Sequence, residues 1–222
     1  MGARYARRQP GELYSMLRPE VQRSSQELER AIVSMLTRHR TAALQELRLL
    51  EAGCGSGSNL TMFIRLGFDA AKLVGNELLP ERATQARRNL PAVTAVLEGD
   101  AAALNIPPGS FDILYCSLVF SSILDDAFQQ RLAARLWELV APGGAFLWYD
   151  FVYDNPANKD VRGVPLHRVR ALFPGARLTY RRVTLAPPIS RRVCRVWPAA
   201  YHVFNALPIL RTHVLCWLEK PR

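Results

Sequence analysis

The sequence predicts an α/β fold, a doubly wound and mostly parallel sheet of seven strands, and three observations support this prediction. Between residues 47 and 149, short apolar runs alternate with helical patterns of apolar residues, which is typical of parallel sheets covered by helices on both faces. The first apolar run ends in a turn rich in glycine. The 222 residues, 49% of them hydrophobic, suffice for a single domain with a sizeable core.

The predicted elements follow one another in a regular order. A helix over residues 20–40 comes first, because apolar residues such as Val21, Leu28 and Ile32 recur at helical spacing. Strands are predicted at residues 47–50, 72–75, 93–97, 111–118, 145–149, 177–184 and 213–219. Helices are predicted at residues 59–66, 80–90, 127–140 and 166–173, with a turn over 141–144 and a loop over 151–164.

The bulk composition excludes several classes of protein. No apolar run reaches the roughly 18 residues that a membrane span needs. The positively charged residues 1–8 are not followed by the apolar region of a signal peptide. The four cysteines lack the spacing of a zinc site or a disulfide framework, so we expect reduced, buried thiols and no metal site. These features favour a cytoplasmic protein.

The turn after the first predicted strand contains an acid and three glycines at alternate positions. Glu51 is followed by Gly53, Gly55 and Gly57. Glycines between a strand and a helix let the backbone approach a ligand that a Cβ would exclude. The dinucleotide-binding pattern would need its third glycine where this chain has Ser58. The turn therefore points to a different ligand.

Further polar residues stand at the ends of later strands, where open α/β sheets bind their ligands. Glu77 lies about 20 residues beyond the glycine turn, and a carboxylate there can accept both hydroxyls of a ribose. Asp100 follows the third strand, and Ser117 stands near the end of the fourth. The alternative for Glu77 is a helix-capping acid before Pro80, and the alternative for Asp100 is a turn aspartate.

With Pro142-Gly143-Gly144 in register behind these acids, residues 49–150 resemble the class I S-adenosylmethionine-dependent methyltransferase superfamily, in particular type 11-like members that act on small molecules and glycans. The resemblance implies a Rossmann-like fold, methyl transfer, and S-adenosyl-L-methionine as the cofactor. In the family, the aspartate that matches Asp100 accepts a hydrogen bond from the adenine amino group. The resemblance assigns these residues to the cofactor: Glu51, Gly53, Gly55, Gly57, Glu77, Asp100, Ala101 and Ser117.

We expect the single domain, residues 1–222, to have three parts that differ in charge. Residues 1–46 form an N-terminal helical cover, residues 47–150 the cofactor-binding core, and residues 151–222 the substrate side. The substrate side has 13 basic and 3 acidic side chains, whereas residues 49–150 have 7 and 11. A basic surface raises the local concentration of an anionic acceptor. The alternative is a solvated surface that only keeps the protein soluble.

The acceptor and the catalytic residues are predicted from fewer observations. The Asn-Pro-Pro-Tyr type motif of enzymes that methylate adenine or amide nitrogens is missing at the end of the fourth strand, which argues against nucleic acid as a partner. A hydroxyl acceptor needs a base near the fifth strand or beyond it. We predict Asp150, His167 and Tyr149 as catalytic residues; Tyr153 and Asp154 are further candidates, and His202 and His213 weaker ones.

These expectations lead to one predicted function with two alternatives. We expect methyl transfer to a small, lipid- or glycan-linked, anionic acceptor, on oxygen rather than on nitrogen. The alternatives are an RNA or protein methyltransferase and a cofactor-binding scaffold without catalysis. Residues 191–211 combine arginines with apolar side chains, which predicts a pocket for a lipid-linked anion, peripheral contact with an anionic membrane, or a helix packed over the sheet.

Overall fold

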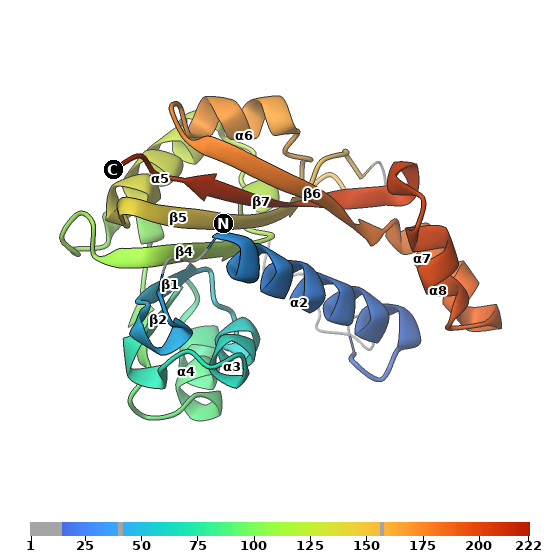
Figure 1. Cartoon of the computed structure of the whole chain (residues 1–222), viewed down its shortest axis with the longest axis horizontal. Helices are drawn as coiled ribbons and strands as arrows, with labels where there is room; N and C mark the ends of the chain where they lie inside the picture. The colour runs from blue at the N-terminus through green and yellow to red at the C-terminus, as the bar shows by residue number, and fades with distance from the viewer. Residues whose placement is uncertain (1–14, 40–41, 156–157) are drawn as a thin grey trace.

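The computed structural model describes residues 15–39, 42–155 and 158–222. Its centre is a seven-stranded sheet with the order β3-β2-β1-β4-β5-β7-β6 (Figure 1). Neighbouring strands are parallel except at β7, which pairs antiparallel with both β5 and β6. The mostly parallel, seven-stranded sheet that the sequence predicts is confirmed.

The strands lie close to their predicted positions, with two corrections. They are β1 (Leu49–Ala52), β2 (Leu73–Glu77), β3 (Ala95–Glu98), β4 (Phe111–Ser117), β5 (Val140–Phe151), β6 (Arg177–Leu185) and β7 (Arg211–Glu219). β1 ends two residues later than predicted, because Glu51 is buried and pairs with Gly75 and Tyr115. The turn predicted over residues 141–144 lies inside β5, because Gly143 and Gly144 form backbone hydrogen bonds with Lys220.

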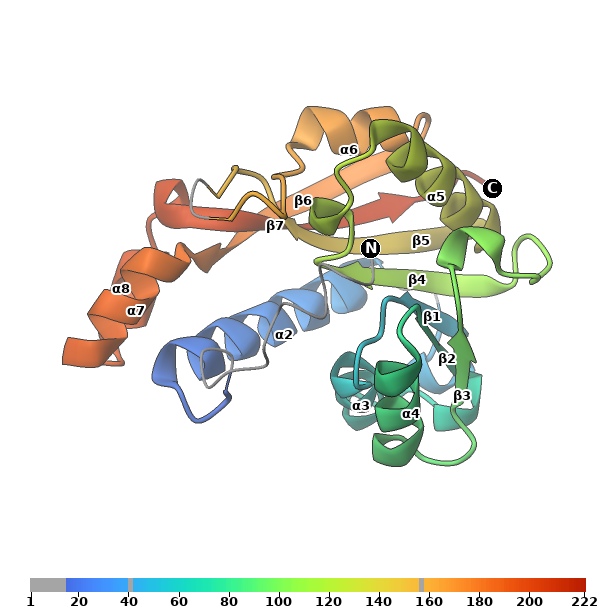
Figure 2. The same cartoon turned by 180° about the vertical axis from the view of Figure 1, so that it is seen from behind.

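Helices cover both faces of the sheet, as the alternation of elements predicts. They are α2 (Pro19–His39), α3 (Ser58–Arg65), α4 (Pro80–Asn89), α5 (Asp126–Leu139) and α6 (Leu166–Leu172). The first three lie below the sheet and the last two above it (Figures 1 and 2). Ile32, Phe63 and Ala86 join α2, α3 and α4 in one buried cluster, and Leu136 and Val169 join α5 and α6 in a second.

The N-terminal cover is present as a helix. α2 packs against β6 and β7, on the same face as α3 and α4. A short 3-10 helix, η2 (Leu44–Glu46), leads from the cover into β1. Residues 1–14 of the predicted cover lie outside the described residues.

The direction of the strands brings several connections to one edge of the sheet. Every strand except β7 ends at this carboxyl edge. The glycine turn follows β1, η4 (Ala101–Ala103) follows β3, and η5 (Phe120–Ser122) follows β4. The chain between β6 and β7 forms α7 (Pro187–Val196), α8 (Ala200–Asn205) and η6 (Pro208–Leu210), and extends beyond the sheet (Figure 1).

The structure also bears on the expectations from composition. All four cysteines are free and buried, as predicted. No helix in the part of the chain that the structure describes is both long and apolar enough to cross a bilayer. Within the same residues, no group of histidine, cysteine and acidic side chains is placed to hold a metal ion.

Candidate functional site

A cleft of about 480 Å³ opens at the carboxyl edge of the sheet. In the sheet β1 lies between β2 and β4, so the strand order reverses beside it. The cleft lies at this point, which is where doubly wound sheets bind ligands. Its volume falls in the range of small-molecule sites. The residues that line it and were predicted from the sequence are Gly53, Glu77, Asp100, Ala101 and Ser117.

The glycine turn is fixed by backbone conformation and by packing. Gly53, Gly55 and Gly57 all have positive φ angles, of 75°, 57° and 87°. A Cβ on Gly53 would lie 2.6 Å from Cγ2 of Val119, and one on Gly57 would lie 2.9 Å from the side chain of Leu90. A Cβ on Gly55 would meet no atom within 4 Å. Protein atoms therefore exclude side chains at two of the three positions, and Gly55 faces open space.

Glu77 connects the glycine turn to the end of β2. Its Oε2 accepts a hydrogen bond from Gly55 N at 2.8 Å, and its Oε1 accepts one from Leu79 N at 3.0 Å. The carboxylate is buried and borders the cleft. Two backbone donors thus fix its position, and the remaining lone pairs can accept hydrogen bonds from ligand hydroxyls.

Asp100 stands at the start of η4 and also borders the cleft. Its Oδ1 accepts a hydrogen bond from Ala102 N at 2.9 Å, so it caps the 3-10 turn. The alternative interpretation, a turn aspartate, therefore holds for one of its two carboxylate oxygens. Because the residue also lines the cleft, the other oxygen is available to a ligand.

Asn76 is a site residue that the sequence reasoning missed. Its backbone oxygen accepts hydrogen bonds from Gly53 N and Cys54 N, at 2.8 and 2.9 Å. Its Nδ2 donates to Gly99 O at 3.0 Å, so this residue joins the turns after β1 and β3. The signal in the sequence is a buried amide within an apolar strand, directly before Glu77.

Glu51 supplies a test of whether the site fits a cationic ligand. Its side chain is fully buried, and Asn59 Nδ2 donates to its Oε1 at 2.6 Å. Its Oε2 has no hydrogen-bond partner among the described residues. Burial raises the pKa of this carboxyl to about 8. An unpaired, buried carboxylate oxygen directly before the glycine turn suits an ammonium group, such as that of the methionine part of S-adenosylmethionine, although Glu51 itself does not line the cleft.

The three predicted catalytic residues do not come together at the cleft. Tyr149 is buried and its OH lies 2.9 Å from Thr184 Oγ1, on the α2 side of the sheet. The buried Asp150 accepts hydrogen bonds from Ser121 N and Phe151 N, at 3.0 and 2.9 Å. Burial raises the pKa of Asp150 to about 7. Neither side chain lines the cleft.

His167 lies at a second hollow, of about 460 Å³, which shares no lining residue with the cleft. The further candidates Tyr153 and Asp154 line this hollow with it, together with Arg162 and Arg168. Most of its lining residues belong to the chain that leads from β5 to α6, which follows Phe151, and to the first turns of α5 and α6. Roles for these residues in catalysis remain predictions.

The two weaker histidine candidates lie in different surroundings. His213 is buried, stacks on Tyr149 with ring centroids 5.1 Å apart, and has a pKa lowered to about 4 by burial. Its surroundings suit a packing role. His202 is exposed on α8, away from the cleft lining.

Comparisons with known proteins agree with the fold and the cleft. Residues 50–148 match the model of a family described as a methyltransferase domain. Over 107 residues, the chain is 29% identical to the demethylmenaquinone methyltransferase of Thermus thermophilus, covering 47% of each protein. Over 113 residues, it is 33% identical to the malonyl-[acyl-carrier protein] O-methyltransferase of Bacteroides fragilis, covering 51% of this chain and 23% of the relative. The chain thus matches at most about half the length of these curated relatives.

Solved structures share the fold across most of the chain. An S-adenosylmethionine-dependent methyltransferase from Mesorhizobium loti superposes with a TM-score of 0.64 at 18% identity, over 86% of this chain and 96% of that one. Residues 50–148 therefore match a methyltransferase domain, and the fold, with its cleft at the point of strand reversal, is the one found in solved S-adenosylmethionine-dependent methyltransferases.

Proposed function

We propose that this chain transfers the methyl group of S-adenosylmethionine to an oxygen of a small, lipid- or glycan-linked, anionic acceptor. The observation that carries the proposal is the cleft, in which the glycine turn, Glu77 and Asp100 meet at one edge of the sheet. The unpaired Oε2 of Glu51 adds a partner for a cationic group.

Positioning is the chain's main contribution to the chemistry. The bound cofactor supplies a methyl group on a sulfonium sulfur, which is reactive without further activation. Glu77 would accept hydrogen bonds from the ribose, Asp100 would accept one from the adenine amino group, and Glu51 would pair with the ammonium group. Holding donor and acceptor in line supplies much of the acceleration of a displacement reaction.

The chemistry of the acceptor decides whether a base is needed. Removing a proton from a hydroxyl would require one of the predicted bases, of which Asp150 has a pKa of about 7 and lies at the end of β5. A carboxylate acceptor is already ionised and needs none. The described lining of the cleft contains neither histidine nor tyrosine, and this favours an acceptor that arrives as an anion.

The charge of the substrate side and the name of one relative support the same acceptor class. That relative is named a malonyl-[acyl-carrier protein] O-methyltransferase, whereas another is named a demethylmenaquinone methyltransferase, which does not indicate an anionic acceptor or transfer to oxygen. Between Asp160 and Glu219 the chain has ten arginines and no acidic residue. Three of them, Arg191, Arg192 and Arg195, lie on α7 beyond the carboxyl end of β6, where they would attract an anionic group.

The same arginines favour the second candidate, an RNA or protein methyltransferase, and both candidates can be tested in one experiment. The protein is incubated with methyl-labelled S-adenosylmethionine and a cell extract, which is then separated into lipid, glycan, RNA and protein. Label in the lipid or glycan fraction supports the proposal, and label in RNA or protein supports the second candidate. Cofactor binding without transfer to any fraction would indicate a scaffold.

A single substitution distinguishes the two kinds of oxygen acceptor. If Asp150 removes a proton from a hydroxyl, Asp150→Asn should lower kcat by about 10²- to 10⁴-fold. If the acceptor is a carboxylate, Asp150→Asn should change kcat only through small shifts of η5, because the Asp150 side chain accepts a hydrogen bond from Ser121 N. The pH profile of the wild-type reaction separates loss of a base from misplacement, because a base leaves an ionisation near pH 7 that the variant lacks.

A further inference from the structure

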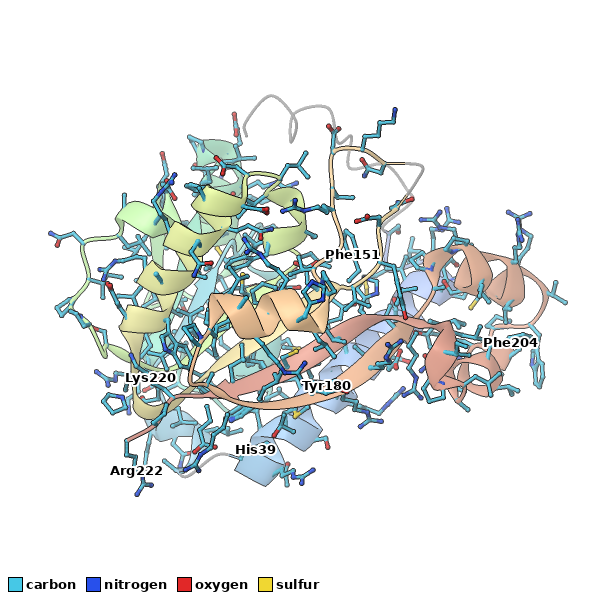
Figure 3. All side chains as sticks on the ribbon, turned by 90° about the horizontal axis from the view of Figure 1, so that it is seen from above. His39, Phe151, Tyr180, Phe204, Lys220 and Arg222 are labelled. Carbon is cyan, nitrogen blue, oxygen red and sulfur yellow. The ribbon has the colours of Figure 1, made fainter. Side chains whose placement is uncertain are left out.

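The segment that connects β6 to β7 forms a projection at the carboxyl edge of the sheet. α7 packs against α2, and α8 and η6 lie beyond it. Leu185, Cys194 and Tyr201 form a small buried cluster of their own, which holds α7 and α8 to the end of β6. Phe204 on α8 lies at the far end of the molecule (Figure 3). The projection is thus a folded element with its own core.

Six apolar side chains of this projection are nevertheless exposed. They belong to the end of α7, to α8 and to the chain around η6: Val196, Trp197, Val203, Phe204, Leu207 and Ile209, here called the apolar tip. Val196 is 88% exposed and Ile209 is 82% exposed. A cluster of large exposed apolar side chains within 14 residues is uncommon on a monomer and marks a surface that binds a partner or a membrane.

The charge around the apolar tip is basic. Arg192 and Arg195 on α7 are exposed, and neither forms an ion pair within the part of the chain that the structure describes. They belong to the run of ten arginines between Asp160 and Glu219 that contains no acidic residue. Exposed apolar side chains beside unpaired arginines match the two layers of an anionic membrane surface, the acyl boundary and the head groups.

We propose that the apolar tip inserts into the surface of an anionic lipid bilayer, with Arg192 and Arg195 at the level of the lipid phosphates. The tip belongs to short elements at the end of a projection that extends beyond the sheet (Figure 1), and a fluid bilayer can accommodate a protruding surface. A second copy of the chain is a poorer partner, because both copies have a net charge of +10 and would bring arginines together.

The position of the projection indicates where the proposed methyl transfer would take place. This step, unlike the membrane binding itself, rests on the proposed function. β6 ends at the same edge as β1, β2 and β4, so the projection and the cofactor cleft lie at one edge of the sheet. A bilayer bound by the apolar tip would meet the protein at that edge. The acceptor would then be reached at the membrane surface, as a lipid-linked anion.

The tryptophans provide a direct readout of insertion. Trp197 is 60% exposed, whereas Trp148 and Trp217 are buried and Trp137 is partly buried. Vesicles of phosphatidylcholine containing phosphatidylglycerol should shift the tryptophan emission to shorter wavelength and should sediment the protein. Vesicles of phosphatidylcholine alone should do so much less. The shift should disappear in Trp197→Phe, which keeps an aromatic side chain at the tip.

Substitutions at the tip and a matched substitution elsewhere test the surface itself. Phe204→Ser combined with Ile209→Ser should weaken binding to the anionic vesicles by about tenfold or more, because two apolar contacts are lost. Val93→Ser is the control, since Val93 is 63% exposed but lies before β3. Arg192→Gln combined with Arg195→Gln should weaken binding and reduce its dependence on salt.

The proposal would be overturned if the tip variants and the Val93→Ser control bound the vesicles equally well. It would also be overturned if the wild-type protein bound neither kind of vesicle and instead formed dimers, and the tip variants did not dimerise. All vesicle measurements are made without cofactor or acceptor. A failure of the membrane-binding proposal is therefore distinguishable from a failure of the proposed methyl transfer. Methyl transfer is measured separately, by cofactor binding and label transfer in the absence of vesicles.

Discussion

At the scale of single residues, two buried carboxyl groups near the carboxyl edge keep their protons at unusually high pH. Burial raises the pKa of Glu51 to about 8 and that of Asp150 to about 7, from ordinary values of 4.5 and 3.8. Because the folded pKa exceeds the unfolded one, the folded state binds these protons more tightly than the unfolded state does. Their contribution to stability is complete below about pH 4 and declines as the pH rises through 7 and 8.

Binding of the cofactor should therefore release a proton from Glu51. A cationic ammonium group beside its unpaired Oε2 favours the carboxylate form, so affinity should rise between about pH 6 and 8. Calorimetric titration at pH 7 in two buffers with different ionisation enthalpies measures the released proton directly. Glu51→Gln should bind more weakly and show no dependence on the buffer. Equal heats for the wild-type protein in both buffers would contradict the pairing.

Alanine substitutions at two glycines of the turn should lower the free energy of unfolding by different amounts. Gly53→Ala should destabilise the protein by about 2–3 kcal/mol, because its Cβ would meet Val119 Cγ2 at 2.6 Å in addition to the left-handed strain. Gly55→Ala should lose only about 1 kcal/mol, the cost of its positive φ. Chemical denaturation of both variants measures the difference. Equal losses would mean that Val119 moves aside at no cost.

At the scale of elements, one buried acid fixes the N-terminal cover to β6 and α8. Glu27 on α2 accepts hydrogen bonds at Oε2 from Thr184 N, at 3.0 Å, and from Tyr201 OH, at 2.7 Å. Thr184 has a φ of 64°, which a β-branched residue rarely adopts, and Tyr149 OH lies 2.9 Å from its Oγ1. α2, β6, α8 and the end of β5 therefore share one network of buried hydrogen bonds.

Removing this acid should destabilise the fold more than removing a partly exposed acid of the same helix. Glu27→Ala should lower the free energy of unfolding by about 2–4 kcal/mol, because the Thr184 amide and the Tyr201 hydroxyl lose their buried acceptor. Glu29→Ala is the matched control, since Glu29 forms an ion pair with Arg65 at the surface, and its loss should cost less than about 1 kcal/mol. Similar losses in urea denaturation would refute the network.

The alternation of side chains along β5 explains why two of the catalytic predictions did not meet at one site. Successive residues of a strand point to opposite faces of the sheet, so Tyr149 and Asp150 cannot face the same cavity. Tyr149 faces α2 and Thr184, and Asp150 faces η5. The alternation was available from the sequence. Which face each residue takes was not, because it depends on how α2 and η5 pack against β5.

The order of the elements was predictable because apolar periodicity reports secondary structure directly. Glu77 and Asp100 were predictable as residues at strand ends, since parallel strands bring those ends to one edge. The bounds of β1 and β5 were not, because a buried glutamate and a glycine pair continue strands where polar and glycine residues usually end them. The role of Asn76 depends on the contact between the turns after β1 and β3, which only the fold creates.

At the scale of the whole molecule, the cofactor cleft and the basic projection occupy one edge of the sheet. Parallel strands send the glycine turn, η4 and η5 to that edge, and β6 adds the projection that ends in the apolar tip. The acidic residues are concentrated in the part proposed to bind the cofactor, and the arginines in the part proposed to meet the acceptor. The two proposed binding surfaces thus differ in charge and lie along the same edge of the sheet.

The central claim, that this cleft holds S-adenosylmethionine, is tested most directly by one pair of variants. Asp100 and Asp69 each accept a hydrogen bond from the amide two residues on, at 2.9 Å, at the start of a 3-10 turn, but only Asp100 lines the cleft. Either alanine variant should therefore lose about 1 kcal/mol of stability. In calorimetric titrations with the cofactor, Asp100→Ala should weaken binding by about tenfold or more, and Asp69→Ala should leave it unchanged. Equal affinity in both variants would contradict the account.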